Sequence, residues 1–316
     1  MIRAGVVGVG YLGRFHAQKY ASLADARLVA VADPNRDALA ALERELRVAG
    51  VEDHRQLIGR VDAVSIVTPT PTHHAIAKDF LEAGVDVLLE KPITVTPREG
   101  AELVAIARRS GRILQVGHLE RFNAVIQAVT PRLSAPRFIE SARLAPFRQR
   151  GTEVDVVLDL MIHDIDLILS MVRSPVVALD AIGSSVFSNE IDIANARLRF
   201  ENGCVANATA SRVSLKTERK LRVFEDDAYL SVDLHQKILT VIRKAAGPVP
   251  EGMPPVSIDE RNFEQGDALK DEIQAFLHSV NTREAPLVSG EDALLALTTA
   301  VQITEQVRRS RARFKS

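Results

Sequence analysis

A glycine-rich segment near the start of the chain has the spacing of a phosphate-binding turn. The motif Gly-x-Gly-x-x-Gly is formed by Gly8, Gly10, Tyr11, Leu12 and Gly13. Its first glycine allows a tight turn, its second lets a pyrophosphate approach the backbone, and its third lets a helix pack on a strand. Because an apolar run precedes the motif and a helical pattern follows it, we expect the backbone N–H groups to bind dinucleotide phosphates.

An acidic residue follows at the distance where such turns need one. Asp33 ends the second apolar run, 20 residues beyond Gly13. A carboxylate there binds the ribose hydroxyls of adenosine and repels a 2′-phosphate, so the sequence favours NAD. Arg36 lies just beyond and could bind that phosphate, which leaves NADP open. A solvated arginine at a helix start is an equally good interpretation.

Two further segments lie where cofactor and substrate are expected to meet. Glu90, Lys91 and Pro92 follow the apolar run 85–89, at the carboxyl end of a strand, where ligands bind in open α/β sheets. A lysine there could donate to a substrate hydroxyl, although a solvated strand-end lysine is also common. The segment Thr68, Pro69, Thr70 and His73 follows the run 63–67 and is predicted to lie on the cofactor side. A solvated histidine pair, His73 and His74, is the alternative.

An acid and a histidine stand four residues apart in a helical pattern. Asp159 and His163 therefore share one helical face. Imidazole has the pKa to accept a hydroxyl proton near neutral pH. A structural hydrogen bond inside a core helix is the competing interpretation. A metal site with Asp164 and Asp166 is disfavoured because the sequence offers no second histidine cluster to complete a shell, so we predict none.

These residues need two kinds of domain to position them. Up to residue 118, β-branched apolar runs alternate with amphipathic segments, which predicts a doubly wound parallel sheet. From residue 119 to 316, strand-like runs follow one another, which predicts an α/β domain on a mainly antiparallel open sheet. Its expected strands are 138–144, 177–186, 193–200, 205–213, 219–224, 229–233 and 238–243. The expected helices are 157–172, 268–281 and 292–309, with a loop at 246–255.

Turn and cap signals refine this organisation. Asn202-Gly203 predicts a type I′ hairpin, and 225–227 a further turn. Thr96 is expected to cap a helix with Pro97 at its first position, and Ser289 to open a capping box.

Composition excludes several functions. Lys plus Arg is 40 and Asp plus Glu is 41, so a nucleic-acid or membrane partner is not expected. Aromatic residues make up 4% with no tryptophan, which is too few for a base-stacking surface. The single cysteine, Cys204, excludes an intramolecular disulfide, and the apolar run at the N-terminus is too short and glycine-rich for a signal peptide. We therefore expect a cytoplasmic protein.

The order of these motifs resembles that of the Gfo/Idh/MocA oxidoreductases. The resemblance covers nearly the whole chain, including the closing segment 286–292. It implies an N-terminal Rossmann domain and a C-terminal domain whose open sheet forms a homodimer or homotetramer. It also implies that His163 takes the hydroxyl proton, Lys91 donates to the same hydroxyl, and Asp159 orients both, with a cis Lys91–Pro92 bond.

The segment 117–123 is similar to one found in the nucleotide-sugar branch, the UDP-N-acetylglucosamine 3-dehydrogenases. By that resemblance Arg121 and Asn123 face the substrate, although Arg121 could instead only join the domains electrostatically. Met161 replaces a glycine that many relatives carry. The implied reaction is hydride transfer from C3 of a UDP-N-acetylhexosamine to NAD(P). The alternatives are a free polyol such as an inositol and a non-catalytic NAD sensor, against which the intact catalytic trio speaks.

Overall fold

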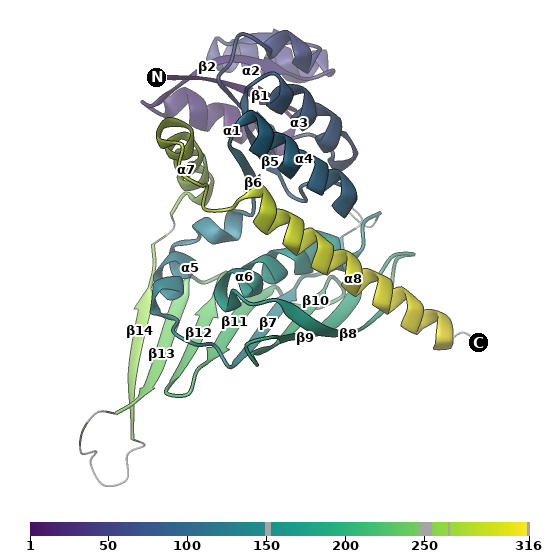
Figure 1. Cartoon of the computed structure of the whole chain (residues 1–316), viewed down its shortest axis with the longest axis vertical. Helices are drawn as coiled ribbons and strands as arrows, with labels where there is room; N and C mark the ends of the chain where they lie inside the picture. Colours follow the sequence, from purple (N-terminus) through teal and green to yellow (C-terminus); the bar gives the residue numbers. More distant parts are fainter. Residues whose placement is uncertain (149–152, 246, 248–254, 265, 315–316) are drawn as a thin grey trace. The chain divides into compact units, whose positions relative to one another are not determined.

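The computed structural model describes residues 1–148, 153–245, 247, 255–264 and 266–314, with side chains to residue 312. The described chain divides into two compact units (Figure 1). The first comprises Met1–Phe122 with Asp267–Leu297, and the second Asn123–Gly266 with Thr298–Ser316. The division differs from the predicted 1–118 and 119–316 because a C-terminal helix returns to the first unit. Its Ile273 and Phe276 join the apolar core of that unit.

The first unit is the predicted doubly wound parallel sheet. Its described strands are β1 Ile2–Val7, β2 Ala26–Ala32, β3 Ala49–Val51, β4 Ala63–Ile66, β5 Asp86–Glu90 and β6 Leu114–Gly117. All are parallel, in the order β3-β2-β1-β4-β5-β6. The order reverses between β1 and β4, and ligands bind in such sheets at the carboxyl ends beside that reversal. The sheet therefore places the ends of β1, β2, β4 and β5 where the sequence expects a cofactor.

Helices alternate with these strands, as the amphipathic pattern predicts, and one further helix of this unit comes from later in the chain. They are α1 Tyr11–Ser22, α2 Arg36–Leu46, α3 His73–Glu82, α4 Pro97–Ser110 and α7 Ala268–Thr282, with short turns η1 His54–Leu57, η2 Thr70–Thr72 and η3 Leu119–Phe122. The capping box of α4 is confirmed, since the Thr96 hydroxyl accepts from Glu99 N–H and the Glu99 carboxylate accepts from Thr96 N–H. Such a cap satisfies N–H groups that a helix leaves unpaired.

The second unit is built on a mainly antiparallel sheet, as predicted. Its described strands are β7 Phe138–Leu144, β8 Val176–Ser184, β9 Ile193–Phe200, β10 Val205–Ser211, β11 Glu218–Phe224, β12 Ala228–Asp233, β13 Ile238–Lys244 and β14 Val256–Asn262. They lie in the order β14-β13-β12-β11-β7-β10-β9-β8, and among these pairs only β7 and β10 are parallel. The predicted loop 246–255 lies almost wholly outside the described residues.

Helices of the second unit contact one face of this sheet (Figure 1). They are α5 Ala124–Val129, which continues into η4 Thr130–Arg132, and the π-turn η5 Val157–Met161, which continues into α6 Ile162–Val172. Helix α8, Gly290–Phe314, begins in the first unit and ends in the second, where Gln306 donates to Leu179 O of β8. The predicted capping box at Ser289 is confirmed by its bonds with Asp292.

The hairpin between β9 and β10 exists, but its predicted turn type is wrong. Phe200 and Cys204 pair across a three-residue loop, and Gly203 has a φ of +87°. Asn202 does not share that positive φ, as a type I′ turn requires. Its side chain instead accepts a hydrogen bond from Cys204 N–H, which stabilises the longer loop.

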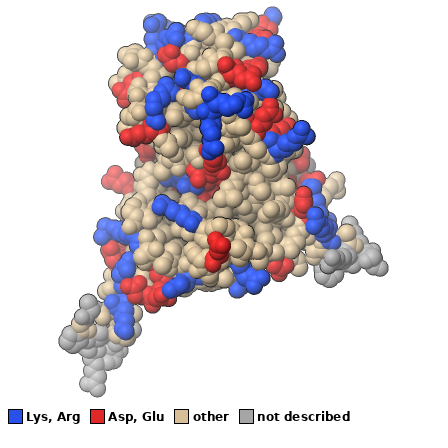
Figure 2. Space-filling model, in the orientation of Figure 1, with Lys and Arg blue, Asp and Glu red and all other residues tan. Residues whose placement is uncertain are grey.

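Basic and acidic side chains alternate across the face drawn in Figure 2, as the near-zero net charge leads one to expect. Among the described residues, no helix is long and apolar enough to cross a membrane.

Candidate active site

The glycine turn between β1 and α1 is shaped for a ligand that approaches the backbone. Gly8 has a φ of +83°, and a Cβ there would lie 2.5 Å from the Val67 carbonyl oxygen. A Cβ on Gly13 would lie 1.8 Å from the Gly8 carbonyl oxygen, so both positions exclude any side chain. At Gly10 the space beyond the backbone is open, and this residue starts α1 without a side-chain cap. The turn therefore offers N–H groups to an anion such as a pyrophosphate.

Asp33 is held beside this turn. Its Oδ2 accepts from Val9 N–H at 2.7 Å, and its Oδ1 accepts from Asn35 N–H at 2.8 Å. The carboxylate retains further acceptor capacity for ribose hydroxyls. Arg36 lies close by in sequence, but its Nε pairs with Glu52 at 2.7 Å and its side chain is 80% exposed. The arrangement fits NAD better than NADP.

His73 joins the two loops that flank the predicted nicotinamide region. Its ring is buried, with Nε2 at 2.8 Å from Thr68 O and Nδ1 at 2.9 Å from Pro92 O. Burial lowers the pKa of His73, against the opposing effect of these carbonyl groups. A neutral ring donates to only one of the two oxygens at a time. His73 thus holds the Thr68–Thr70 segment against the turn that follows Lys91, and it can influence a cofactor through those loops.

Lys91 directly follows β5, at the carboxyl edge of the parallel sheet, where ligands bind in folds of this kind. The Lys91–Pro92 bond is cis, which confirms the expectation. The Lys91 N–H donates to Glu90 Oε2 at 3.2 Å, so the strand end is tied to its own last side chain. Lys91 is half-buried.

Asp159 and His163 lie on consecutive turns of one helical segment, as the spacing predicts. Asp159 is in the π-turn η5 and His163 in the first turn of α6, and both are half-buried. Single π-turns inside helices occur frequently at functional sites. Met161, between them in sequence, is fully buried and packs in the core of this unit. Asp164 is paired on both oxygens with Arg143, at 2.9 and 3.1 Å, which explains its burial without a metal.

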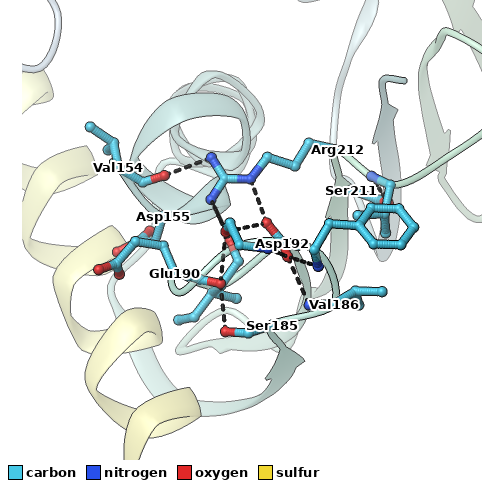
Figure 3. A network of polar contacts seen from close by, with 12 residues as sticks. Val154, Asp155, Ser185, Val186, Glu190, Asp192, Ser211 and Arg212 are labelled. Atoms are coloured by element: carbon cyan, nitrogen blue, oxygen red, sulfur yellow. Dashed lines mark hydrogen bonds and ion pairs between the residues drawn. The ribbon is translucent and has the colours of Figure 1, made fainter. Parts of the chain in front are cut away.

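A buried polar network fixes the start of this segment (Figure 3). Asp155 accepts from Val157 N–H and Leu158 N–H, both at 3.0 Å, in the manner of a helix cap. Arg212 donates to Val154 O at 2.7 Å and to Asp192 Oδ1 at 2.9 Å. The network therefore ties the residues just before η5 to Arg212, directly after β10, and to the loop after β8.

The pKa values of the two acids, Asp155 and Asp192, are shifted in opposite directions. Burial raises the pKa of Asp155, although Arg308 and its hydrogen bonds oppose that effect. Burial alone would also raise the pKa of Asp192, but the hydrogen bonds from Ser188, Phe187 and Arg212 together hold it well below its usual range. Asp192 is thus a buried, fully ionised anchor.

The remaining predicted substrate residues are divided between the units. Arg121 lies in η3 of the first unit and is half-buried. Asn123 begins the second unit as the N-cap of α5, where its side chain accepts from Val125 N–H at 3.2 Å. Lys91 likewise belongs to the first unit, and Asp159 and His163 to the second.

Two residues of the first unit were missed by sequence reasoning. His16 on α1 and Glu272 on α7 are buried and lie close to Glu90. Together with Glu90 they come from three distant parts of the chain, and no local motif marks their meeting.

A parallel sheet with this glycine turn and Asp33, followed by an α/β domain on an open sheet, defines a two-domain dehydrogenase of the Rossmann type. A family model described as oxidoreductase family, NAD-binding Rossmann fold, matches residues 2–118. The GFO/IDH/MocA C-terminal domain matches residues 127–231. The chain belongs to the Gfo/Idh/MocA family of NAD-binding oxidoreductases.

Relatives with assigned activities share nearly the full length. The chain is 39% identical over 303 residues to a UDP-N-acetylglucosamine 3-dehydrogenase from Acidithiobacillus ferrooxidans, covering 96% of each. A solved structure of that enzyme superposes with a TM-score of 0.92 over 97% of each chain. A scyllo-inositol 2-dehydrogenase (NAD(+)) from Bacillus subtilis is 26% identical, over 97% of this chain and 94% of that protein. A Lactobacillus casei scyllo-inositol dehydrogenase with bound NAD(H) and scyllo-inositol, at 22% identity over 98% of each chain and a TM-score of 0.81, shares the fold.

Proposed function

We propose that this oxidoreductase oxidises the C3 hydroxyl of a UDP-N-acetylhexosamine with NAD as hydride acceptor. The observation that carries the proposal is the full-length similarity, at 39% identity, to an enzyme of that activity. The segment 117–123, with Arg121 and Asn123, supports a nucleotide-sugar substrate. A cationic side chain such as Arg121 suits a diphosphate.

The residues on the first unit fit the cofactor. The turn of Gly8, Gly10 and Gly13 would hold the pyrophosphate, and Asp33 the adenosine ribose. When bound, NAD supplies the hydride acceptor, which no protein side chain can replace. The Thr68 segment, His73, Glu90 and Lys91 are proposed to shape the region of the nicotinamide.

Three side chains are proposed to handle the reacting hydroxyl. His163 takes its proton as general base, since imidazole titrates near neutral pH. Lys91 donates a hydrogen bond to the same oxygen and favours the developing alkoxide. Asp159, one helical turn before His163, orients substrate and base. The buried network around Arg212 and Asp192 supports this assignment because it preorganises the segment.

A free cyclitol is the second candidate substrate, and inositol dehydrogenases among the relatives favour it. The decisive experiment measures NAD reduction with UDP-N-acetylglucosamine, UDP-N-acetylgalactosamine, myo-inositol and scyllo-inositol, in wild type and in Lys91→Met. We expect turnover with a UDP-sugar, and almost none in Lys91→Met although NAD still binds. Turnover with an inositol alone would overturn the substrate, and normal turnover of Lys91→Met would overturn the catalytic assignment.

We also propose a cytoplasmic homo-oligomer that assembles through the open sheet of the second unit. Val177 and Ile182 on β8 and Ile258 on β14 are 58–64% exposed, which supports a covered surface there. Burial raises the pKa of the free Cys204 thiol to about 11, which keeps it unreactive and suits a reducing compartment. Light scattering on the purified protein would give the subunit number, and a monomer at all concentrations would refute the assembly.

A further inference from the structure

Three ionisable side chains converge inside the first unit. His16 on α1, Glu90 at the end of β5 and Glu272 on α7 place one side-chain atom each within 4.8 Å of the others. His16 is 1% exposed and Glu272 is 0% exposed. Of the three, only Glu90 has a place in the function proposed above, and it adjoins Lys91.

Glu90 is the member that connects this cluster to Lys91. Its Oε1 lies 3.4 Å from His16 Nε2, and its Oε2 accepts from Lys91 N–H at 3.2 Å. A Cβ on Gly117 of β6 would lie 3.1 Å from the Glu90 carboxylate, so a glycine there leaves that group just enough room. Any shift of the Glu90 carboxylate therefore acts on the end of β5 that carries Lys91.

The burial of the Glu272 carboxyl group is not explained by the contacts of its side chain. Its main-chain oxygen accepts from Gln115 Nε2 at 3.1 Å, which fixes α7 against β6. Among the described residues, neither carboxyl oxygen of Glu272 receives a hydrogen bond. A carboxylate buried in that way would cost several kcal/mol, whereas a neutral acid needs only an acceptor for its proton. A carboxyl oxygen of Glu90 lies within 4.8 Å of one of Glu272, a separation that a bridging water can span.

The surroundings favour that neutral form. Burial, and next the charge of Glu90, raise the pKa of Glu272 well above its ordinary value. The elements packed against α7 carry these other titratable groups: Tyr11, Arg14, His16, Lys19 and Tyr20 on α1, Asp86 on β5, and Glu120 and Arg121 on η3. Burial raises the pKa of Tyr20, so its phenol stays neutral and adds no charge.

We propose that Glu272 is a positioning residue for Lys91: as a neutral acid it donates to Glu90, directly or through one water, and Glu90 holds the strand end that carries Lys91. The proposal rests on the catalytic role proposed for Lys91. A divalent cation bound by the three residues is the competing explanation. It is disfavoured because a metal-bound imidazole needs a partner for its second nitrogen, and neither His16 nitrogen has a hydrogen-bond partner among the described residues.

The first experiment compares Glu272→Leu with Glu272→Gln. Leucine removes the donor, so Lys91 loses its fixed position and kcat falls roughly 10–10²-fold, the scale of a small misplacement. Glutamine keeps an N–H donor toward Glu90 and recovers most of the loss. Phe276→Leu, on the same helix and equally buried, is the matched control, which lowers stability but leaves kcat within the wild-type range. Equal kcat values for the Leu and Gln variants would overturn the proposal.

The second experiment reads the proton itself by infrared spectroscopy near neutral pH. A protonated carboxyl group gives a carbonyl stretch that carboxylates lack. The wild type should show this band and Glu272→Gln should lose it, while Asp226→Asn, at an exposed carboxylate paired with Arg137, should leave it unchanged. If Glu272→Gln keeps the band, the proposal is wrong. It is also wrong if the purified protein carries one equivalent of zinc per chain and a chelator removes that zinc.

The two proposals fail in different ways. If Lys91→Met keeps its turnover, the catalytic assignment fails. If Lys91→Met is inactive and both Glu272 variants match wild type in kcat, only the positioning role fails.

Discussion

The buried Asp192–Arg212 pair gives a sharp test of what holds the segment with Asp159 and His163. Asp192 Oδ2 accepts the N–H groups of residues 186, 187 and 188 at 2.7, 2.7 and 2.9 Å. Its Oδ1 accepts from Arg212 Nε at 2.9 Å and from the Ser188 hydroxyl at 2.6 Å. The two side chains are 0% and 6% exposed.

Asp192→Asn should therefore be costly although it changes one atom. The new amide NH2 must face either the three backbone N–H groups or the Arg212 guanidinium, so donors oppose donors and a buried cation loses its counter-charge. Removing one partner of a buried ion pair costs about 3–5 kcal/mol. We expect a loss of that size in the free energy of unfolding, and a fall in kcat because residues 154–163 lose their anchor.

Denaturant unfolding measures the energy, and hydrogen exchange locates it. Amides 186–188 and the first turn of η5 should lose protection, whereas β5 should not. Asp226→Asn is the matched control, because Asp226 pairs with Arg137 in the open, at 74% and 58% exposure, and such pairs contribute about 0–1 kcal/mol. If Asp192→Asn costs no more than this control, the reasoning about the buried pair is wrong.

The same pair predicts a dependence on pH. The pKa of Asp192 is lower in the folded chain than its ordinary value of 3.8. Its contribution to stability is therefore fully present above pH 3.8 and is lost as the pH falls toward the folded pKa. The stability difference between wild type and Asp192→Asn should be constant near neutral pH and shrink below pH 3.8, and a difference that grows with acid would contradict the assignment.

Three further substitutions test the cofactor and the base. Asp33→Ala should narrow the preference for NAD over NADP in binding titrations, and tighter NADP binding by the wild type would instead favour Arg36. Gly13→Ala should abolish NAD binding, since its Cβ would lie 1.8 Å from a backbone oxygen, and retained affinity would show that the turn moves freely. His163→Ala should lower kcat by roughly 10²–10⁴-fold with NAD affinity unchanged, and near-normal turnover would make His163 a structural residue.

Local signals in the sequence predict most of the fold. Strands 138–144 and 193–200 match the structure in both bounds, and buried residues alternate with less buried ones along both strands. The caps at Thr96 and Ser289 were readable for the same reason, since each is a pattern within four residues. Strand β14 was missed because Val256–Asn262 is exposed throughout and largely polar, so only pairing with β13 makes it a strand.

Some residues of the candidate site could be predicted from local sequence patterns, and others could not because they meet only in the folded chain. The glycine turn, Asp33 and the Asp159–His163 spacing are local patterns, and each could be recognised from the sequence alone. The cluster of His16, Glu90 and Glu272 could not, because its members meet only after α1, β5 and α7 have packed. A buried glutamate contradicts the apolar pattern expected on the buried face of an amphipathic helix. The sequence alone does not show which residues on other elements lie beside it.

Contacts between residues far apart in the sequence hold the helical segment of Asp159 and His163 in place, which no local motif does. A helix that presents a base must resist rotation, and η5 has a looser backbone than an α-helix. Asp155 caps its start, Arg212 grips the preceding carbonyl group at Val154, and Asp192 neutralises Arg212. Arg212 and Asp192 are buried and oppositely charged, so weakening either leaves the other unsatisfied. Substitutions in this chain should therefore lower kcat without touching substrate, whereas the exposed pairs elsewhere on the same sheet should be replaceable.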